Sequence, residues 1–310
     1  MDERSAPPEP AGYRHPHYAA SFSEWARPLH LPGSNGWLLA RQIPGTPHWD
    51  AMGTYPLFCC DDWTQLGNDL SNIAMDLVSV VLVTDPFGNY TQQCLDASFD
   101  NARHFKDHFV VDLTRPLEEN VTKKNRATAR RALRKVRVQL VPDPAGCIDT
   151  WMDLYTGMIR RQKVTGIRNF SRESFLMQLK TPGAFVFEAV AEDQVIGLDM
   201  IYVDNDTAYG HVCAFNELGY TLRASYATRW RMLEFLKGRV RFLDFGASVG
   251  TEANSEDDGL ASYKKRWCSV TRPVFLCSAV FDQKVYDQLS RQHSGPEKVA
   301  YFPAYRRGEY

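Results

Sequence analysis

The chain has 310 residues, which is long enough for two domains, because a single hydrophobic core seldom grows beyond about 250 residues. Hydrophobic residues make up 44% and charged residues 24% of the sequence, a composition that excludes a largely disordered protein. Lys and Arg number 36 and Asp and Glu 37, for a formal net charge of -1. The overall field therefore attracts no nucleic acid, and any phosphate contact must come from a local basic patch.

Two further features exclude classes of protein. No stretch approaches the roughly 18 consecutive apolar residues of a membrane span, and the acidic, Pro-rich N-terminus does not resemble a signal peptide. We therefore expect a cytoplasmic protein. The seven cysteines are scattered without a C-x-x-C pair, a spacing that predicts reduced thiols and no structural metal.

The first part of the chain predicts a small unit of mixed structure. Residues 1–24 are Pro-rich and are predicted to be a disordered lead. Residues 25–143 are predicted to form the first unit. Hydrophobic patterning predicts its strands and helix at 37–43 (strand), 62–75 (helix), 76–85 (strand) and 108–113 (strand).

A basic helix is predicted to end this first unit. The stretch "TKKNRATARRALRKVR", residues 122–137, has eight basic residues among sixteen. Ala129, Ala132, Leu133 and Val136 supply an apolar stripe among strong helix formers. The pattern predicts an amphipathic helix with a basic outer face.

Residues 144–285 are predicted to form a second unit, and residues 286–310 a C-terminal tail. Three strands in a row, separated by turn residues, predict an antiparallel meander. The expected elements are 149–162 (helix), 184–191, 194–204 and 207–215 (strands), 223–238 (helix), 241–246 (strand), 259–268 (helix) and 272–281 (strand). The predicted fold class is α+β (mixed α/β), with a mostly antiparallel sheet flanked by helices in each unit.

The strand order and three sequence words carry a resemblance to a known family. The words "DQVIGLDMIYVDNDTAYGHVCAF", "RASYATRWRMLEFLKGRVRFLDFG" and "GLASYKKRW" resemble the second half of the FemABX-like branch of the GNAT acyltransferase superfamily. The stretch "NRATARRALRKVRVQL" resembles the helix found where the two halves of such proteins join. The resemblance covers residues 100–282, and residues 25–100 fit a degenerate first GNAT unit. It implies two GNAT-like units and a donor that carries an activated acyl group into the second.

The resemblance also implies catalytic residues. Relatives have a Phe-Lys pair after a Gly-Leu stretch, and here Tyr263 and Lys264 stand at those positions. The lysine would stabilise the oxyanion of the tetrahedral intermediate, and Tyr in place of Phe adds a hydroxyl. The residues by themselves allow a second interpretation, in which Lys264, Lys265 and Arg266 form a solvated basic turn.

Asp244, at the end of the strand "RFLDFG", is the candidate general base that deprotonates the acceptor amine. The alternative is a structural role, in which its carboxylate caps the turn at Gly246. The candidate donor-binding residues are Arg223, Ser225, Gly246, Lys265 and Arg266. The glycine-rich CoA signature of GNAT enzymes is missing before residue 223, which disfavours CoA as donor.

The basic helix is the candidate contact for the phosphates of tRNA or of a pantetheine-linked donor. Its candidate residues are Lys123, Lys124, Arg126, Arg130, Arg131 and Arg134. A solvated helix face is the alternative. In "HFKDH", His104 and His108 have the spacing of a zinc-protease pair, but the catalytic Glu is missing, so we predict no metal site there.

The predicted function is amide formation, with transfer of an aminoacyl group from aminoacyl-tRNA to an amine of a small molecule, a peptide intermediate or a cell-wall precursor, in specialised metabolite biosynthesis. No metal or redox cofactor is expected, because the tRNA serves as co-substrate. One alternative is an N-acyltransferase that uses acyl-CoA or an acyl-carrier-protein thioester. The other is a non-catalytic GNAT-like module that binds RNA or a carrier protein.

Overall fold

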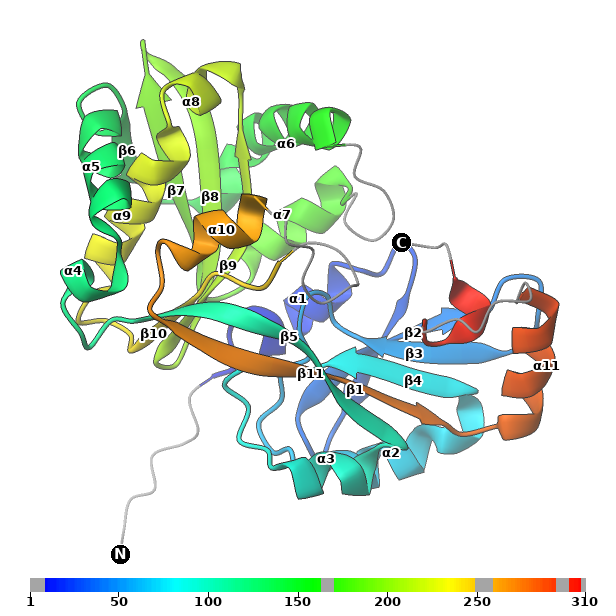
Figure 1. Ribbon diagram of the computed structural model, residues 1–310. Coiled ribbons are helices and arrows are strands. Elements are labelled where there is room, and N and C mark those ends of the chain that lie inside the picture. Colours follow the sequence, from blue (N-terminus) through cyan, green and yellow to red (C-terminus); the bar gives the residue numbers. More distant parts are fainter. Residues whose placement is uncertain (1–8, 163–169, 249–258, 294–300, 308–310) are drawn as a thin grey trace, which may run out of the picture. The chain divides into compact units, whose positions relative to one another are not determined.

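The computed structural model describes residues 9–162, 170–248, 259–293 and 301–307, and these form two compact units. Unit 1 comprises the described parts of residues 1–15, 108–162 and 178–271. Unit 2 comprises those of residues 16–107, 163–177 and 272–310. Strands β5 (Asn101–Asp112) and β11 (Val270–Val280) contribute residues to both units (Figure 1).

Unit 1 is built on the strand order β5-β10-β9-β8-β7-β6. All neighbours pair antiparallel except β10 and β9, which are parallel. Its elements are η1 (Gly12–Arg14), α4 (Leu117–Asn120), α5 (Lys123–Ala132), β6 (Arg137–Leu140), η3 (Pro144–Cys147), α6 (Ile148–Gln162), β7 (Ala184–Ala191), β8 (Gln194–Asp204), β9 (Thr207–Phe215), α8 (Glu217–Thr221), α9 (Ala224–Leu236), β10 (Phe242–Asp244) and α10 (Gly259–Lys265).

The predicted antiparallel meander is confirmed in β7, β8 and β9. Glu192 and Asp193 connect β7 to β8 with φ values of 51° and 56°, the positive values that a tight hairpin turn requires. Asn205, with φ of 53°, has the same role between β8 and β9. Local turn chemistry therefore fixes the register of the sheet that carries the site.

Strand β9 has a bulge in its pairing with β8. The register of β8 and β9 shifts between Met200 and Ile201, so that His211 is an extra residue in β9. The pairing of β10 with β9 ends at Asp244 and Tyr209, whereas the chain after β10 stays hydrogen-bonded to β5 through Phe109. The pairing of the two parallel strands therefore ends at Asp244.

Helices cover both faces of this sheet (Figure 1). Helix α9 lies along β6, β7 and β8 with α5 packed against its outer side, and α6 lies against β8 and β9 on the other face. The core beneath α9 includes Trp230, Leu233, Ile201 and Trp267, all buried. Apolar burial therefore holds α9 and the end of α10 to the same face of the sheet.

Unit 2 has the strand order β1-β2-β3-β4-β11, antiparallel except for β3 and β4. Its elements are α1 (Pro16–Ala20), β1 (Arg27–Leu31), β2 (Gly36–Gln42), β3 (Trp49–Gly53), α2 (Leu66–Ile73), η2 (Ala74–Asp76), β4 (Ser79–Val83), α3 (Gln92–Ser98), α11 (Gln283–His293) and η5 (Ala304–Arg306), with α7 (Arg172–Lys180) divided between the units. Phe58, Trp63 and Leu82 are buried in its core.

The described parts of both terminal segments contain folded structure that the sequence did not predict. Within the predicted lead of residues 1–24, η1 and α1 are formed, and Tyr18 is fully buried in unit 2. Within the predicted tail of residues 286–310, Arg306 forms a buried ion pair with Asp50 at 2.5 Å. The aromatic and charged side chains of these segments find partners that a Pro-rich or polar composition does not reveal.

The predicted α+β class is confirmed, because each unit is a mixed, mostly antiparallel sheet with flanking helices. The predicted domain boundaries at residues 143 and 285 stay predictions, since the compact units are built from discontinuous segments. None of the described helices has both the length and the apolar character that a bilayer crossing demands.

Candidate active site

The turn after β10 brings the first candidate residues together. Asp244 is 2% exposed, and its Oδ1 accepts a hydrogen bond from the backbone N–H of Gly246 at 2.7 Å. Gly246 has φ of 71°, a conformation that favours glycine. The capping interaction considered from the sequence is therefore present, and it uses only one of the two carboxylate oxygens.

Lys264, on α10, reaches this same turn. Its Nζ donates a hydrogen bond to the carbonyl of Ala247 at 2.7 Å, and a Cβ added to Gly246 would lie 3.4 Å from that nitrogen. Burial lowers the pKa of Lys264 to about 8, an effect that the Asp244 carboxylate opposes and the Arg229 guanidinium adds to. The side chain is thus a largely protonated cation near neutral pH, close to its titration range.

His108 completes the turn from the neighbouring strand β5. Its Nδ1 lies 2.7 Å from Oδ2 of Asp244, and both side chains are almost fully buried. Because an ionised carboxylate can only accept, Nδ1 is the nitrogen that donates, and in the neutral form of the ring Nε2 carries the lone pair. The spacing of His104 and His108 was considered as a metal-binding pair, and that site was rejected because the catalytic Glu is missing. The pairing of His108 with Asp244 was not predicted from the sequence.

A second ion pair lies beside Lys264. Nε of Arg229 on α9 is 3.2 Å from Oδ2 of Asp199 on β8, and the Arg229 guanidinium stacks 4.7 Å from the ring centroid of Phe245. Burial raises the pKa of Asp199, although Arg229 and a hydrogen bond from Thr228 oppose this. In the sequence, the only indication of this pair is the single acidic residue Asp199 within the apolar strand "QVIGLDMIYV", and Asp199 was not among the predicted site residues.

Tyr263 lies against the start of α9. Its hydroxyl approaches the carbonyl of Ser225 at 3.4 Å, and its ring packs edge-on against Tyr226 with centroids 5.2 Å apart. Burial raises the pKa of Tyr263 well above its usual range. The residue is therefore a neutral aromatic surface beside Lys264, the geometry that the Tyr-for-Phe replacement was expected to preserve.

Three other candidates occupy different places. Arg223 is exposed at the N-cap of α9 with φ of 59°, and Lys265 is exposed on α10. Arg266 is half-buried, and its backbone carbonyl accepts a hydrogen bond of 3.0 Å from the N–H of Thr122. The described structure thus brings Tyr263, Lys264, Asp244, Gly246 and Ser225 together and leaves Arg223 and Lys265 at the surface.

Helix α5 presents the expected basic face. Thr122 caps it, accepting from the N–H of Asn125 at 3.4 Å, and Ala129 and Ala132 are buried against α9. The candidate phosphate contacts Lys123, Lys124, Arg130, Arg131 and Arg134 are exposed, and Arg126 is half-buried. Among the described residues, no carboxylate lies within 4.0 Å of these six basic side chains. Their charge is therefore not neutralised by ion pairs within the described chain.

Comparisons with known proteins place this arrangement in a class. Residues 119–265 match the family model described as an acetyltransferase (GNAT) domain. The fold is similar to a crystal structure of FemX, at 12% identity and a TM-score of 0.63, covering 88% of this chain and 93% of that one.

Two further solved structures share the fold. The C-terminal domain of an Agrobacterium fabrum protein assigned as a lysylphosphatidylglycerol synthetase is 12% identical, with a TM-score of 0.62, covering 90% of this chain and 92% of that one. L-PGS from Bacillus licheniformis is 12% identical, with a TM-score of 0.58, covering 91% of this chain and 96% of that one. No curated protein sequence matches the chain.

Residues 119–265 therefore match a GNAT domain, and the chain has the fold of FemX and of the two other solved structures. The expected resemblance to GNAT and FemABX-like proteins is confirmed at the level of the fold and of the domain match. The roles of individual residues stay predictions.

Proposed function

We propose that the chain is a cytoplasmic N-acyltransferase that moves an aminoacyl group from aminoacyl-tRNA to an amine, in a small molecule, a peptide intermediate or a cell-wall precursor of specialised metabolite biosynthesis. The observation that carries this proposal is the cation of Lys264, which lies beside Asp244 where β10 leaves β9. A fixed cation beside the end of a strand pair can stabilise the oxyanion that forms from an acyl carbonyl.

The proposed reaction forms one C–N bond and breaks one C–O ester bond. The acceptor amine attacks the aminoacyl carbonyl, and the Lys264 ammonium donates a hydrogen bond to the oxygen that becomes negative. The attacking nitrogen loses a proton to a base, and the ribose hydroxyl gains one as it leaves. This chemistry needs only side chains and the donor, with no metal or redox cofactor.

His108 is the base in this proposal, and Asp244 positions it. Both oxygens of Asp244 already accept hydrogen bonds, from Gly246 and from His108, so the carboxylate has a positioning role. It holds the imidazole with Nδ1 protonated, and the other nitrogen, Nε2, accepts the proton from the amine. The proposal thereby moves the base from Asp244 to its histidine partner.

The basic face of α5 supports tRNA as the donor. The hydrogen bond from Thr122 to Arg266 joins the first turn of α5 to the end of α10, two residues beyond Lys264. Phosphate contacts at Lys123 and Lys124 would therefore lie near the candidate catalytic cation. A charged tRNA requires this proximity, because its phosphates continue up to the nucleotide that carries the ester.

A thioester donor is the second candidate. It is favoured by the matched family model, whose description is that of an acetyltransferase domain. Against it, Arg223 and the start of α9 stand where a glycine-rich loop would hold the CoA pyrophosphate.

The test is a transfer assay with pools of charged tRNA and candidate amines, followed as a mass shift of the amine. Ribonuclease added before the chain should abolish product formation, and acetyl-CoA should not restore it. Activity that survives ribonuclease would refute the tRNA proposal, and activity with acetyl-CoA alone would establish the thioester alternative.

A further inference from the structure

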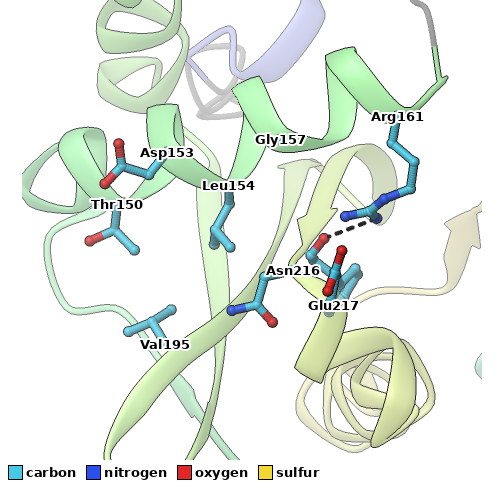
Figure 2. Close-up of a pocket in the computed structure, with 9 residues that line it drawn as sticks. Thr150, Asp153, Leu154, Gly157, Arg161, Val195, Asn216 and Glu217 are labelled. Carbon is cyan, nitrogen blue, oxygen red and sulfur yellow. Dashed lines mark hydrogen bonds between the residues drawn. The ribbon is translucent and has the colours of Figure 1, made fainter.

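A groove in unit 1 lies apart from the cluster around Lys264. It has a volume of about 360 Å³ between α6 and the chain that leaves β9 for α8. Figure 2 shows Asp153 and Thr150 at one end, Arg161 and Glu217 at the other, and Leu154 between them. The groove is therefore polar at both ends and apolar in its middle.

Gly157 lies in the interior of α6 and lines this groove. Glycine in a helix interior lowers stability relative to alanine, so an unforced glycine there needs a reason. A Cβ added at Gly157 would have no atom of the described protein within 4 Å, apart from its chain neighbours and the nearby backbone of its own helix. The packing of the protein therefore does not require the glycine, and the open space beside it can take a ligand that lies across the helix.

Charged side chains stand one helical turn on either side of this glycine. Asp153, Gly157 and Arg161 are spaced four residues apart, which places them along one face of α6 (Figure 2). With a rise of about 1.5 Å per residue, the carboxylate and guanidinium positions are about 12 Å apart along the helix. An extended peptide covers that length with three to four residues, at about 3.3–3.6 Å each.

Arg161 is already positioned to bind an anion. Its guanidinium stacks 4.5 Å from the ring centroid of Tyr220 and donates one long hydrogen bond of 3.5 Å to the carbonyl of Phe215. No carboxylate of the described residues lies within 4.0 Å of it, which leaves most of its N–H donors available. Asn216 uses its Oδ1 to cap α8 through Gly219. Figure 2 shows its amide nitrogen turned toward the middle of the groove.

We propose that this groove binds a zwitterionic ligand of short-peptide length, with its ammonium at Asp153 and its carboxylate at Arg161. The backbone of the ligand passes over Gly157, and its amide carbonyls accept from Asn216. The binding is a property of the groove and does not depend on the transfer reaction, so it is measured without any acyl donor.

The experiment is calorimetric titration of the full chain with trialanine and with trialanine blocked by N-acetylation or C-amidation. We expect the free peptide to bind and each blocked peptide to bind at least about 10-fold more weakly, because each block removes a charge-assisted contact. Arg161→Gln should produce the same loss for the free peptide and should abolish the effect of C-amidation. Arg160→Gln, its exposed neighbour, is the matched control and should bind like the wild type.

Gly157→Ala separates this proposal from a purely structural role. It should raise the melting temperature by about 2–4 °C through helix propensity, and yet weaken the binding of trialanine at least about 10-fold by filling the groove. The proposal is wrong if the wild type does not bind free trialanine, if blocked and free peptides bind equally, or if Gly157→Ala leaves the affinity unchanged.

Discussion

Replacement of Lys264 is the strongest test of the candidate active site. A cation aimed at the oxyanion contributes about 3–4 kcal/mol to transition-state stabilisation, so Lys264→Met should lower kcat by about 10²–10³-fold. The matched control is Lys265→Met on the same helix, whose side chain is exposed, and its effect should be less than about threefold. Equal, small effects at both positions would refute the assignment and favour the non-catalytic alternative.

The pH dependence of kcat distinguishes a Lys264 that acts as an ammonium from one that acts as a neutral base. With the pKa of Lys264 at about 8, roughly nine-tenths of the side chain is ammonium at pH 7 and about one-tenth at pH 9. If the ammonium stabilises the oxyanion, kcat should fall about tenfold per pH unit above 8. A rate that rises through pH 8 would instead make the neutral lysine a base and would contradict the proposed mechanism.

The stability of the protein should change with pH in a related way. The folded-state pKa of Lys264 lies below its ordinary value of 10.5, so between about pH 8 and 10.5 the unfolded chain binds more protons than the folded one. This group therefore makes the free energy of unfolding rise with pH across that window. Lys264→Met should remove that part of the rise, as measured by urea denaturation at pH 7 and pH 10.

Three other predictions follow from the same unit. His108→Gln should lower kcat by about 10²-fold with little change in KM, measured by steady-state kinetics, and an unchanged kcat would exclude the histidine as base. Asp199→Asn should destabilise the fold by about 3–5 kcal/mol in urea denaturation because it leaves Arg229 buried without its partner, whereas replacing both residues by apolar ones should cost much less. Lys123→Glu with Lys124→Glu should raise KM for charged tRNA and flatten its salt dependence, and a KM that does not respond would remove α5 from the donor site.

Much of the fold can be predicted from the sequence because its signals are local. The alternating strands and the turn residues Glu192 and Asp193 predict the meander of β7, β8 and β9, which the structure confirms. Strands β1 and β3 were missed, because they are only five residues each and carry little periodicity. The folded segments at both chain ends were missed because their stability depends on distant partners.

The candidate site also has a part that can be predicted from the sequence and a part that only the tertiary structure shows. The family resemblance of the stretch "GLASYKKRW" singles out Lys264, and the acid at the end of the strand "RFLDFG" makes Asp244 a candidate. Their proximity, the pairing of His108 with Asp244 across 136 positions and the lowered pKa of Lys264 all depend on the packing of separate segments of the chain. Hydrogen-bond geometry and desolvation arise only when those segments pack together, so the sequence determines which groups are present and the tertiary structure decides which of them act together.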